Sequence, residues 1–201
     1  MSTGTPAVGR PRAFDEETVL DRAIQVFWQH GYEGASLSAL TSAMGINKPS
    51  LYATFGSKEL LFQRAFARYH ERQVAIARAA LARPTAYEAI EAFLRSSAAG
   101  LTASDSPPGC LSVQGGLACS PENTRISETL AAGRAATEAA LEERLSRAAA
   151  EGDLPGGLDA RALARFVQAL SEGHAVHAAA GASCEDLQAS VDIAMRVVRY
   201  Q

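Results

Sequence analysis

The sequence predicts an all-α fold of about nine helices, in a chain of 201 residues that is long enough for one or two domains. Apolar side chains recur at helical spacing, and no stretch alternates β-branched and polar residues as a strand would. Alanine, the strongest helix former, is abundant. Breakers and capping residues divide the chain into helical segments at residues 15–30, 37–44, 47–55, 58–81, 86–101, 110–119, 121–151, 160–180 and 184–201.

Each of the first four helices has a recognisable start or end. The first begins with acidic residues, which suit the positive end of a helix dipole, and Gly31 is expected to stop it. Ser36 is the expected N-cap of the second helix, and Ser57 that of the fourth. Pro49 falls in the first turn of the third helix, where a missing N–H costs nothing. Pro84 ends the fourth helix.

Similar signals divide the rest of the chain. Thr85 and Glu88 form the pattern of a capping box that opens the fifth helix. Ser120 followed by Pro121 predicts the start of the seventh helix, and Asp159 and Ser183 predict the starts of the last two. Gly, Pro and Ser cluster in two expected connections, residues 102–109 and 152–157.

Composition excludes several classes of protein. Hydrophobic residues make up 47% and charged residues 20%, which is ordinary for a soluble globular chain. No apolar run reaches the roughly 20 residues of a membrane span, and the first nine residues lack the pattern of a secretory signal. The three cysteines form no C-x-x-C pair and no disulfide framework. We therefore expect a cytoplasmic protein with no membrane partner.

The sequence also lacks the usual marks of catalysis. It contains no nucleophile elbow G-x-S-x-G, no phosphate-binding G-x-x-x-x-G-K-[ST] and no zinc-binding H-E-x-x-H. We accordingly expect no enzyme activity, no cofactor and no metal. The net charge of −3 conceals an asymmetry, because residues 1–83 hold 10 Lys and Arg against 7 Asp and Glu. The cationic bias of this front part is compatible with a polyanionic partner.

The segment from Ser36 to Lys58 has the pattern of a helix-turn-helix, two short helices around the turn Met44-Gly45-Ile46. Its second helix is slim enough to enter the major groove of DNA, where lysine donates to guanine, hydroxyls contact either base type and a proline ring meets a thymine methyl. The starts of the neighbouring helices offer free N–H groups to phosphates. The outer face of this reading helix is expected to present Lys48, Pro49, Ser50, Tyr52 and Thr54.

From residue 14 to about residue 69 the sequence resembles the tetracycline-repressor (TetR) family of bacterial transcription regulators. The resemblance rests on the run AIQVFWQHGY at residues 23–32, on the turn Met44-Gly45-Ile46, and on Ser50-Leu51-Tyr52 followed by FGSKELL at residues 55–61. It implies that the outer-face residues named above contact operator DNA. It further implies phosphate contacts from Ser36, Tyr52 and Lys58.

The resemblance also implies the division of the chain. Residues 1–13 are expected to be a flexible arm, whose Arg10 and Arg12 either enter a neighbouring minor groove or belong to a solvated tail. Residues 14–58 would be the DNA-binding domain and residues 59–201 a helical domain for ligand binding and dimerisation. On this view the protein is a regulator, expected to be a repressor, that binds a pseudo-palindromic double-stranded operator as a homodimer and is released by an unknown small-molecule effector.

Two sets of residues are the candidates for these roles in the second domain. A mostly apolar set with a few polar groups is the candidate effector pocket: Phe62, Phe66, Tyr69, Phe93, Cys110, Leu111, Gln114, Leu117 and His174. Apolar stripes on the last two helices are the candidate dimer interface: Leu163, Phe166, Val167, Leu170, His177, Leu187, Val191, Met195 and Val198.

Three alternatives stay open at this point. Cys110 stands at the expected start of a helix, where the dipole favours a thiolate and would suit a thiol sensor. His174 and His177 lie one helical turn apart and would suit a metal-sensing regulator. A helical module that binds another protein instead of DNA is the third, and it predicts little dependence of binding on salt.

Overall fold

The computed structural model describes residues 15–115, 119–154 and 158–199, and within these ranges every regular element is a helix. The all-α prediction is confirmed. No helix in these ranges is both long enough and apolar enough to cross a membrane. The elements are α1 (Glu16–Gly34), α2 (Leu37–Met44), α3 (Lys48–Phe55), α4 (Lys58–Leu81), α5 (Ala86–Leu101), α6 (Leu111–Gln114), the 3₁₀ helix η1 (Pro121–Asn123), α7 (Thr124–Ala150), α8 (Ala160–Ala179) and α9 (Cys184–Arg199).

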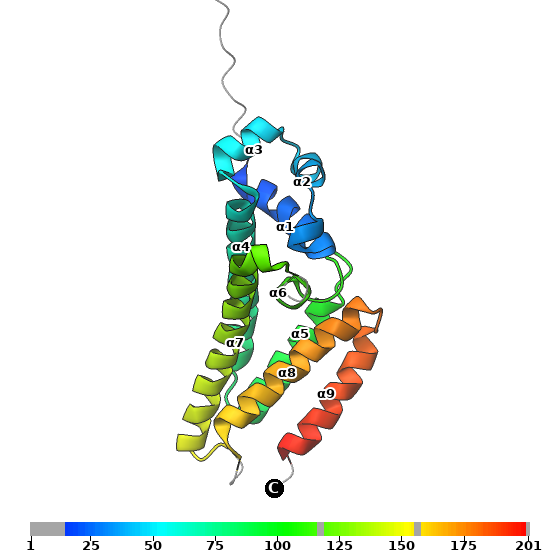
Figure 1. The fold of residues 1–201 in the computed structure, drawn as a ribbon. Coiled ribbons are helices and arrows are strands. Elements are labelled where there is room, and N and C mark those ends of the chain that lie inside the picture. Colours follow the sequence, from blue (N-terminus) through cyan, green and yellow to red (C-terminus); the bar gives the residue numbers. More distant parts are fainter. Residues whose placement is uncertain (1–14, 116–118, 155–157, 200–201) are drawn as a thin grey trace, which may run out of the picture.

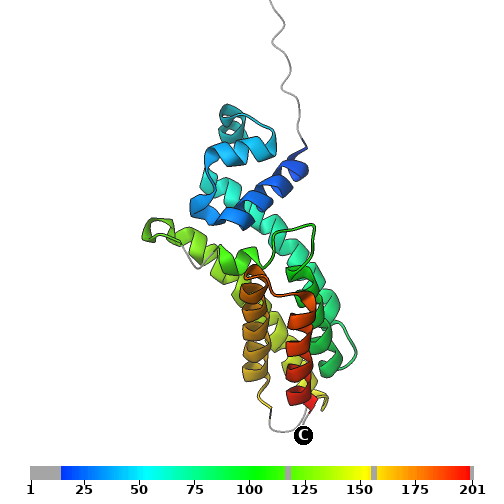
Figure 2. The ribbon, with the colours of Figure 1, turned by 90° about the vertical axis from the view of Figure 1, so that its right-hand side faces the viewer.

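The helices form an elongated molecule with a small head at one end. Helices α1, α2 and α3 make up this head, and α4 leads from it into a bundle with α5, α7, α8 and α9 (Figure 1). The side view shows the same separation of head and bundle, with α8 and α9 next to each other (Figure 2). Helix α4 packs on α1 in the head and on α5 and α7 in the bundle, so it belongs to both parts.

The predicted caps are present where their bonding is local. The hydroxyl of Ser36 accepts from Ala39 N, and that of Ser57 accepts from Leu60 N, both at 3.1 Å. The capping box of α5 is complete, because Thr85 accepts from Glu88 N while the Glu88 carboxylate accepts from Thr85 N. These side chains satisfy N–H groups that the first turn of a helix leaves without partners.

Gly31 interrupts the first helix at the predicted position. Its backbone breaks the helix at φ 66° and ψ 175°, but helical turns resume and continue to Gly34. Tyr32 follows the break and is buried, with its ring centroid 5.4 Å from that of Phe62. The kink that glycine permits therefore turns the end of α1 so that this tyrosine reaches the core.

Ser120 does not cap the seventh helix, which corrects the prediction. Its backbone N and its hydroxyl both donate to Glu33 on α1, at 3.1 and 2.7 Å, and Asn123 Nδ2 donates to the same oxygen. These hydrogen bonds lower the pKa of Glu33. Pro121 opens the 3₁₀ turn η1 instead, and α7 begins at Thr124. The predicted sixth helix is also shorter than expected, at residues 111–114.

A buried arginine fixes the far end of α4. Arg144 on α7 donates through Nε to the carbonyl of Leu81, and through Nη2 to the carbonyls of Arg83 and Pro84, each at 3.1 Å. Its Nη2 also lies 3.8 Å from Asp153, whose carboxylate accepts from Ala86 N. One side chain thus satisfies carbonyls that the helix end and the following turn leave unpaired.

Candidate functional site

The reading helix α3 is held by its buried face and by a cap. Asn47 Oδ1 accepts from Ser50 N at 2.8 Å, and Leu51 and Phe55 are buried in the head. The opposite face is open to solvent, and there Tyr52 exposes 46% of its surface. The structure places the predicted reading residues on or beside this face, with Lys48, Pro49 and Tyr52 exposed and Ser50 and Thr54 half-buried.

The turn before α3 sets its angle to α2. Gly45 has a left-handed backbone, φ 69° and ψ 28°, and Ile46 N donates to the carbonyl of Thr41 at 3.1 Å. This backbone conformation strains any residue with a Cβ atom. Leu40 and Met44 on α2 are buried in the same core as Leu51. The two short helices are therefore packed as one unit.

Lys58 begins α4 directly after the reading helix. Its ammonium lies 4.5 Å from the centroid of the Tyr32 ring, and burial lowers its pKa while the charge of Glu33 opposes that shift. Ser36, at the start of α2, is exposed. Each of these predicted phosphate-contacting residues stands at a helix N-terminus, where backbone N–H groups and the helix dipole favour an anion.

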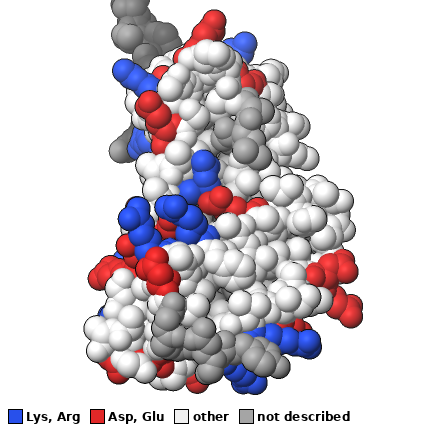
Figure 3. All heavy atoms as spheres, turned by 60° about the horizontal axis from the view of Figure 1, so that its bottom comes forward, with Lys and Arg blue, Asp and Glu red and all other residues white. Residues whose placement is uncertain are grey.

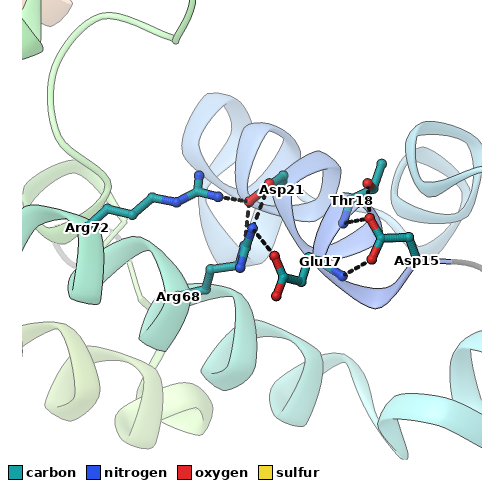
Figure 4. A network of polar contacts seen from close by, with 6 residues as sticks. All are labelled: Asp15, Glu17, Thr18, Asp21, Arg68 and Arg72. Carbon is teal, nitrogen blue, oxygen red and sulfur yellow. Dashed lines mark hydrogen bonds and ion pairs between the residues drawn. The ribbon is translucent and has the colours of Figure 1, made fainter.

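Ion pairs join the head to α4. Arg68 on α4 donates to both carboxylate oxygens of Asp21 on α1, and Arg72 donates to Oδ1 of the same carboxylate at 2.7 Å (Figure 4). Arg68 also lies 3.2 Å from Glu17. The hydrogen bond from Arg68 is the main cause that lowers the pKa of Asp21, and desolvation opposes it. These ion pairs therefore connect α4 to α1 along the first turns of α1.

A cavity opens among the helices of the bundle, where Trp28 of α1 contributes to its lining. It encloses about 870 Å³ of empty space, open solvent at its mouth included, and it is bounded by residues of α1 and α4 to α8. One wall is aromatic and is formed by Trp28, Tyr69, His70 and Phe93. A polar wall is formed by Ser97, Arg134, Gln168, Ser171 and Glu172.

The polar wall is linked by hydrogen bonds. Arg134 donates to the carbonyl of Ser112, and its Nε lies 3.8 Å from Glu172 Oε1. Gln168 Nε2 donates to that same carboxylate oxygen at 2.8 Å. The hydroxyls of Ser97 and Ser171 share a hydrogen bond of 2.8 Å. The opposite charges of this wall are thus paired with each other.

The structure brings three of the predicted pocket residues to the cavity, namely Tyr69, Phe93 and Cys110. The hydroxyl of Tyr69 and Sγ of Cys110 are 3.2 Å apart, and burial raises the pKa of Tyr69 well above its ordinary value. The phenol therefore remains protonated near neutral pH. Cys110 is half-buried at the cavity wall.

The other predicted pocket residues do not line the cavity, and we correct their assignment. Phe62, Phe66 and Leu111 are buried in the core that the head shares with α4, because their helix faces turn toward α1. Gln114 packs under Gly109, where a Cβ atom would come within 2.6 Å of its Oε1. His174 is buried against Ser190 of α9 and hydrogen-bonds to its hydroxyl. Leu117 lies outside the described residues.

The two histidines of α8 have different surroundings. His174 is buried, and desolvation together with the charge of His177 lowers its pKa, whereas His177 is exposed. In the ranges that the structure describes, no group of three or more His, Cys, Asp or Glu side chains is placed to hold a metal ion.

The predicted dimer-interface set divides into buried and accessible side chains. Most of it belongs to the core of the chain itself, with exposures of 7% or less, and is reassigned there: Leu163, Val167, Leu187, Val191, Met195 and Val198. These side chains pack against the chain's own helices because α5 lies beneath α8 and α9. Phe166 and His177 are exposed, and Leu170 is half-buried. The sequence analysis missed three exposed apolar residues on the same two helices: Val176, Ile193 and Val197.

Comparison with known proteins places both parts of the chain. Two family models match it, "Bacterial regulatory proteins, tetR family" over residues 19–65 and "Tetracyclin repressor-like, C-terminal domain" over residues 86–194. The HTH-type transcriptional repressor ComR of Escherichia coli (strain K12) is 35% identical over 191 residues, which cover 94% of this chain and 91% of ComR. The uncharacterized HTH-type transcriptional regulator YezE of Bacillus subtilis (strain 168) is 32% identical over 95% of this chain and 100% of YezE.

A solved structure of similar sequence contains DNA. The TetR family transcriptional regulator CifR, as a cysteine mutant complexed with 26-base-pair double-strand operator DNA, is 43% identical to this chain. The superposition has a TM-score of 0.90 and covers 94% of this chain and 98% of the CifR chain. The likeness therefore extends over the head and the bundle together.

Proposed function

The chain belongs to the TetR family of bacterial transcription regulators, and on that premise we propose that it is a repressor that binds a double-stranded operator and is released by a small-molecule effector. The observation that supports this most directly is the open face of α3, on which Lys48, Pro49 and Tyr52 are exposed while the opposite face is buried. In the proposal Lys48 reads bases in the major groove, and Tyr52 contacts a phosphate.

The same proposal assigns a function to each part of the chain. Residues 14–58 bind DNA, with Ser36 and Lys58 on phosphates, and residues 59–201 bind the effector and a second copy of the chain. The segment 1–13, with Arg10 and Arg12, lies outside the described residues. We further propose that the protein works in the cytoplasm and catalyses no reaction.

A homodimer is proposed to form through the outer faces of α8 and α9. Phe166 and Val176 on α8 and Ile193 and Val197 on α9 expose between 42% and 63% of their surface. Figure 3 shows a wide area without Lys, Arg, Asp or Glu, with charged side chains at its margins. Two copies joined here would present two α3 helices to one face of a duplex, and half-sites about 34 to 36 Å apart would fit them.

The cavity supports the proposed response to an effector. Its aromatic wall includes Trp28 from α1 and Tyr69 from α4, the two helices that Asp21 and Arg68 join. A ligand that fits the cavity only after α4 has moved would favour the conformation that does not fit the operator. By linkage, operator DNA would then weaken effector binding by the same factor, with a coupling of about 1 to 3 kcal/mol.

Selection from random double-stranded DNA tests the regulator directly. The purified chain should enrich a pseudo-palindrome, and the affinity for that sequence should fall steeply as salt rises. The variant Lys48→Ala should lose this enrichment, whereas Arg147→Ala, a change of an exposed arginine in the last turn of α7, should keep it. Enrichment of no sequence, or an affinity independent of salt, would favour a partner other than DNA.

A thiol sensor is a second candidate for the same cavity. Cys110 offers its sulfur at the cavity wall, within 3.2 Å of the Tyr69 hydroxyl, so an electrophile that enters the cavity would meet it. Alkylation of the intact protein with iodoacetamide, mapped by mass spectrometry, tests this candidate. Labelling of Cys110 ahead of Cys119 and Cys184, with loss of operator binding, supports it, and an unreactive Cys110 contradicts it.

A further inference from the structure

Two residues that line the cavity each hold a buried polar atom without a hydrogen-bond partner in the described part of the chain. One is the indole N–H of Trp28, a hydrogen-bond donor on the aromatic wall. The other is Oε1 of Gln168, a hydrogen-bond acceptor on the polar wall. Buried polar groups are nearly always paired in folded proteins, so each of these atoms calls for a partner from outside the chain.

The orientation of the Gln168 amide is fixed by its neighbour. Its Nε2 donates to Glu172, and a carboxylate accepts hydrogen bonds but does not donate them. An amide turned the other way would set its oxygen against this carboxylate. The free atom of Gln168 at the cavity is therefore an acceptor, and it needs a donor.

The charges of the cavity cancel. Among the residues that line the cavity, the arginine is Arg134 and the acidic residue is Glu172. Arg134 Nε lies 3.8 Å from Glu172 Oε1, so the two charges balance each other. A charged ligand would have to compete with this pair, or leave its own charge without a partner in a partly desolvated space. The site therefore favours an uncharged ligand.

We propose that the cavity takes an uncharged molecule with a flat apolar body that carries one hydrogen-bond acceptor and one donor, as an aromatic carboxamide or alcohol does. The body lies against Tyr69 and Phe93, its acceptor receives the Trp28 N–H, and its donor reaches Gln168 Oε1. This inference rests on the proposed function of the cavity as the effector site, and it specifies the chemical class of the effector.

The chain contains its own reporter for this site. Trp28 is its single tryptophan, so a change in fluorescence excited at the red edge of the indole band reports events at the cavity wall. Four probes of nearly equal shape separate the contributions: benzamide is neutral with donor and acceptor, acetophenone has the acceptor alone, benzoate is an anion and benzamidine a cation. Each is titrated at about pH 8, where imidazole is ordinarily neutral.

Benzamide is expected to give a saturable signal and the lowest Kd of the four. Acetophenone should bind about tenfold more weakly, because Gln168 Oε1 then keeps no donor, and benzoate and benzamidine weaker still. In Gln168→Leu the advantage of benzamide over acetophenone should vanish. The control Gln25→Leu, on the exposed side of α1, should leave all four values unchanged. A melting-temperature measurement on each variant confirms that it is folded.

The charge argument has a test of its own. Glu172→Gln removes the anion that balances Arg134, so the preference should move from benzamide toward benzoate by about tenfold or more. Tighter binding of benzoate or benzamidine than of benzamide to the unaltered chain, or saturable binding of none of the probes, overturns the proposal. Loss of operator recognition would instead overturn the proposed function, and it is measured without any of these probes.

Discussion

Arg68 on α4 donates a hydrogen bond to each carboxylate oxygen of Asp21 on α1, with Nε 2.7 Å from Oδ1 and Nη2 3.1 Å from Oδ2. This two-pronged contact has a fixed geometry, which a lysine in place of the arginine would not reproduce. The contact joins α1, which belongs to the head, to α4, which contributes Tyr69 to the cavity. The contact therefore lies on the physical route between the two proposed binding sites.

Replacing Asp21 by Asn should weaken this junction and change its response to pH. Because the folded chain lowers the pKa of Asp21, the pair contributes stability above the ordinary value of about 3.8, and that contribution is lost as the pH falls through the lowered pKa. The variant should lose about 0.5 to 1 kcal/mol at pH 7, a modest figure because the carboxylate is partly exposed. Urea unfolding at pH 7 and near pH 3 measures both effects, and an equal deficit at the two values would contradict the assignment.

Replacing Arg144 by Met should cost far more. The change leaves the carbonyls of Leu81, Arg83 and Pro84 without their donor inside the protein, so we expect a loss of roughly 3 kcal/mol of unfolding free energy. Arg147→Met removes an exposed arginine one turn along α7 and should stay within about 0.5 kcal/mol. Equal midpoints for the two variants in urea would contradict the structural role given to Arg144.

His174 should make the chain sensitive to acid. Burial lowers its pKa below the ordinary 6.5, so the unfolded chain takes up a proton that the folded chain resists. The contribution of neutral His174 to the unfolding free energy is complete above pH 6.5, and it declines as the pH falls toward the lowered pKa. His174→Gln should reduce the slope of the unfolding free energy against pH below about 6.5, as urea unfolding at a series of pH values would measure.

Lys48 at the start of α3 and Lys58 at the start of α4 should affect DNA binding differently. Lys48→Ala should cost roughly 1 to 3 kcal/mol on the preferred operator and relax its specificity, because this side chain is proposed to contact bases. Lys58→Ala should weaken binding to all duplexes alike and reduce the dependence on salt. Fluorescence anisotropy with matched and scrambled duplexes makes the comparison, and equal losses on both duplexes for Lys48→Ala would contradict its role.

A charge on the outer face of α9 should separate the proposed dimer. Ile193→Glu places a carboxylate among the exposed apolar side chains of α8 and α9, and it should shift the chain to monomer in sedimentation at micromolar concentration. Leu60→Glu is a matched control, since Leu60 exposes 48% of its surface on α4. An unchanged sedimentation coefficient for Ile193→Glu would place the interface elsewhere.

Local signals were enough to predict most of the fold. Ser36, Ser57, Thr85 and Asp159 cap helices through bonds to residues two or three positions away, so short sequence patterns contain the whole interaction. Ser120 shows the limit of this reasoning. Its partner Glu33 lies 87 positions earlier in the chain, and no local pattern predicts that the hydroxyl would leave its own helix for that carboxylate.

The cavity could be predicted only in part for the same reason. The sequence predicts Tyr69, Phe93 and Cys110 because they are large or reactive side chains, but the polar wall depends on pairing Arg134 of α7 with Glu172 of α8. A usable signal was present, since Gln168, Ser171 and Glu172 interrupt the apolar face of one helix. An apolar stripe such as Val167 or Val191 also fits a chain's own core as well as it fits a partner, and only the packing of α5 decides between them.

Arg144 holds the C-terminal end of α4 in place through the carbonyls of Leu81, Arg83 and Pro84. The 24 residues of α4 span about 36 Å at 1.5 Å per residue. Between its two ends, Tyr69 of this helix lines the cavity, so a molecule in the cavity would press on the middle of α4. The other end of α4 begins at Lys58 and is tied to α1 through Arg68 and Asp21. If the proposed effector displaces α4 beside Tyr69, the anchored end is expected to move least, and the displacement would pass to α1 and the proposed reading helix.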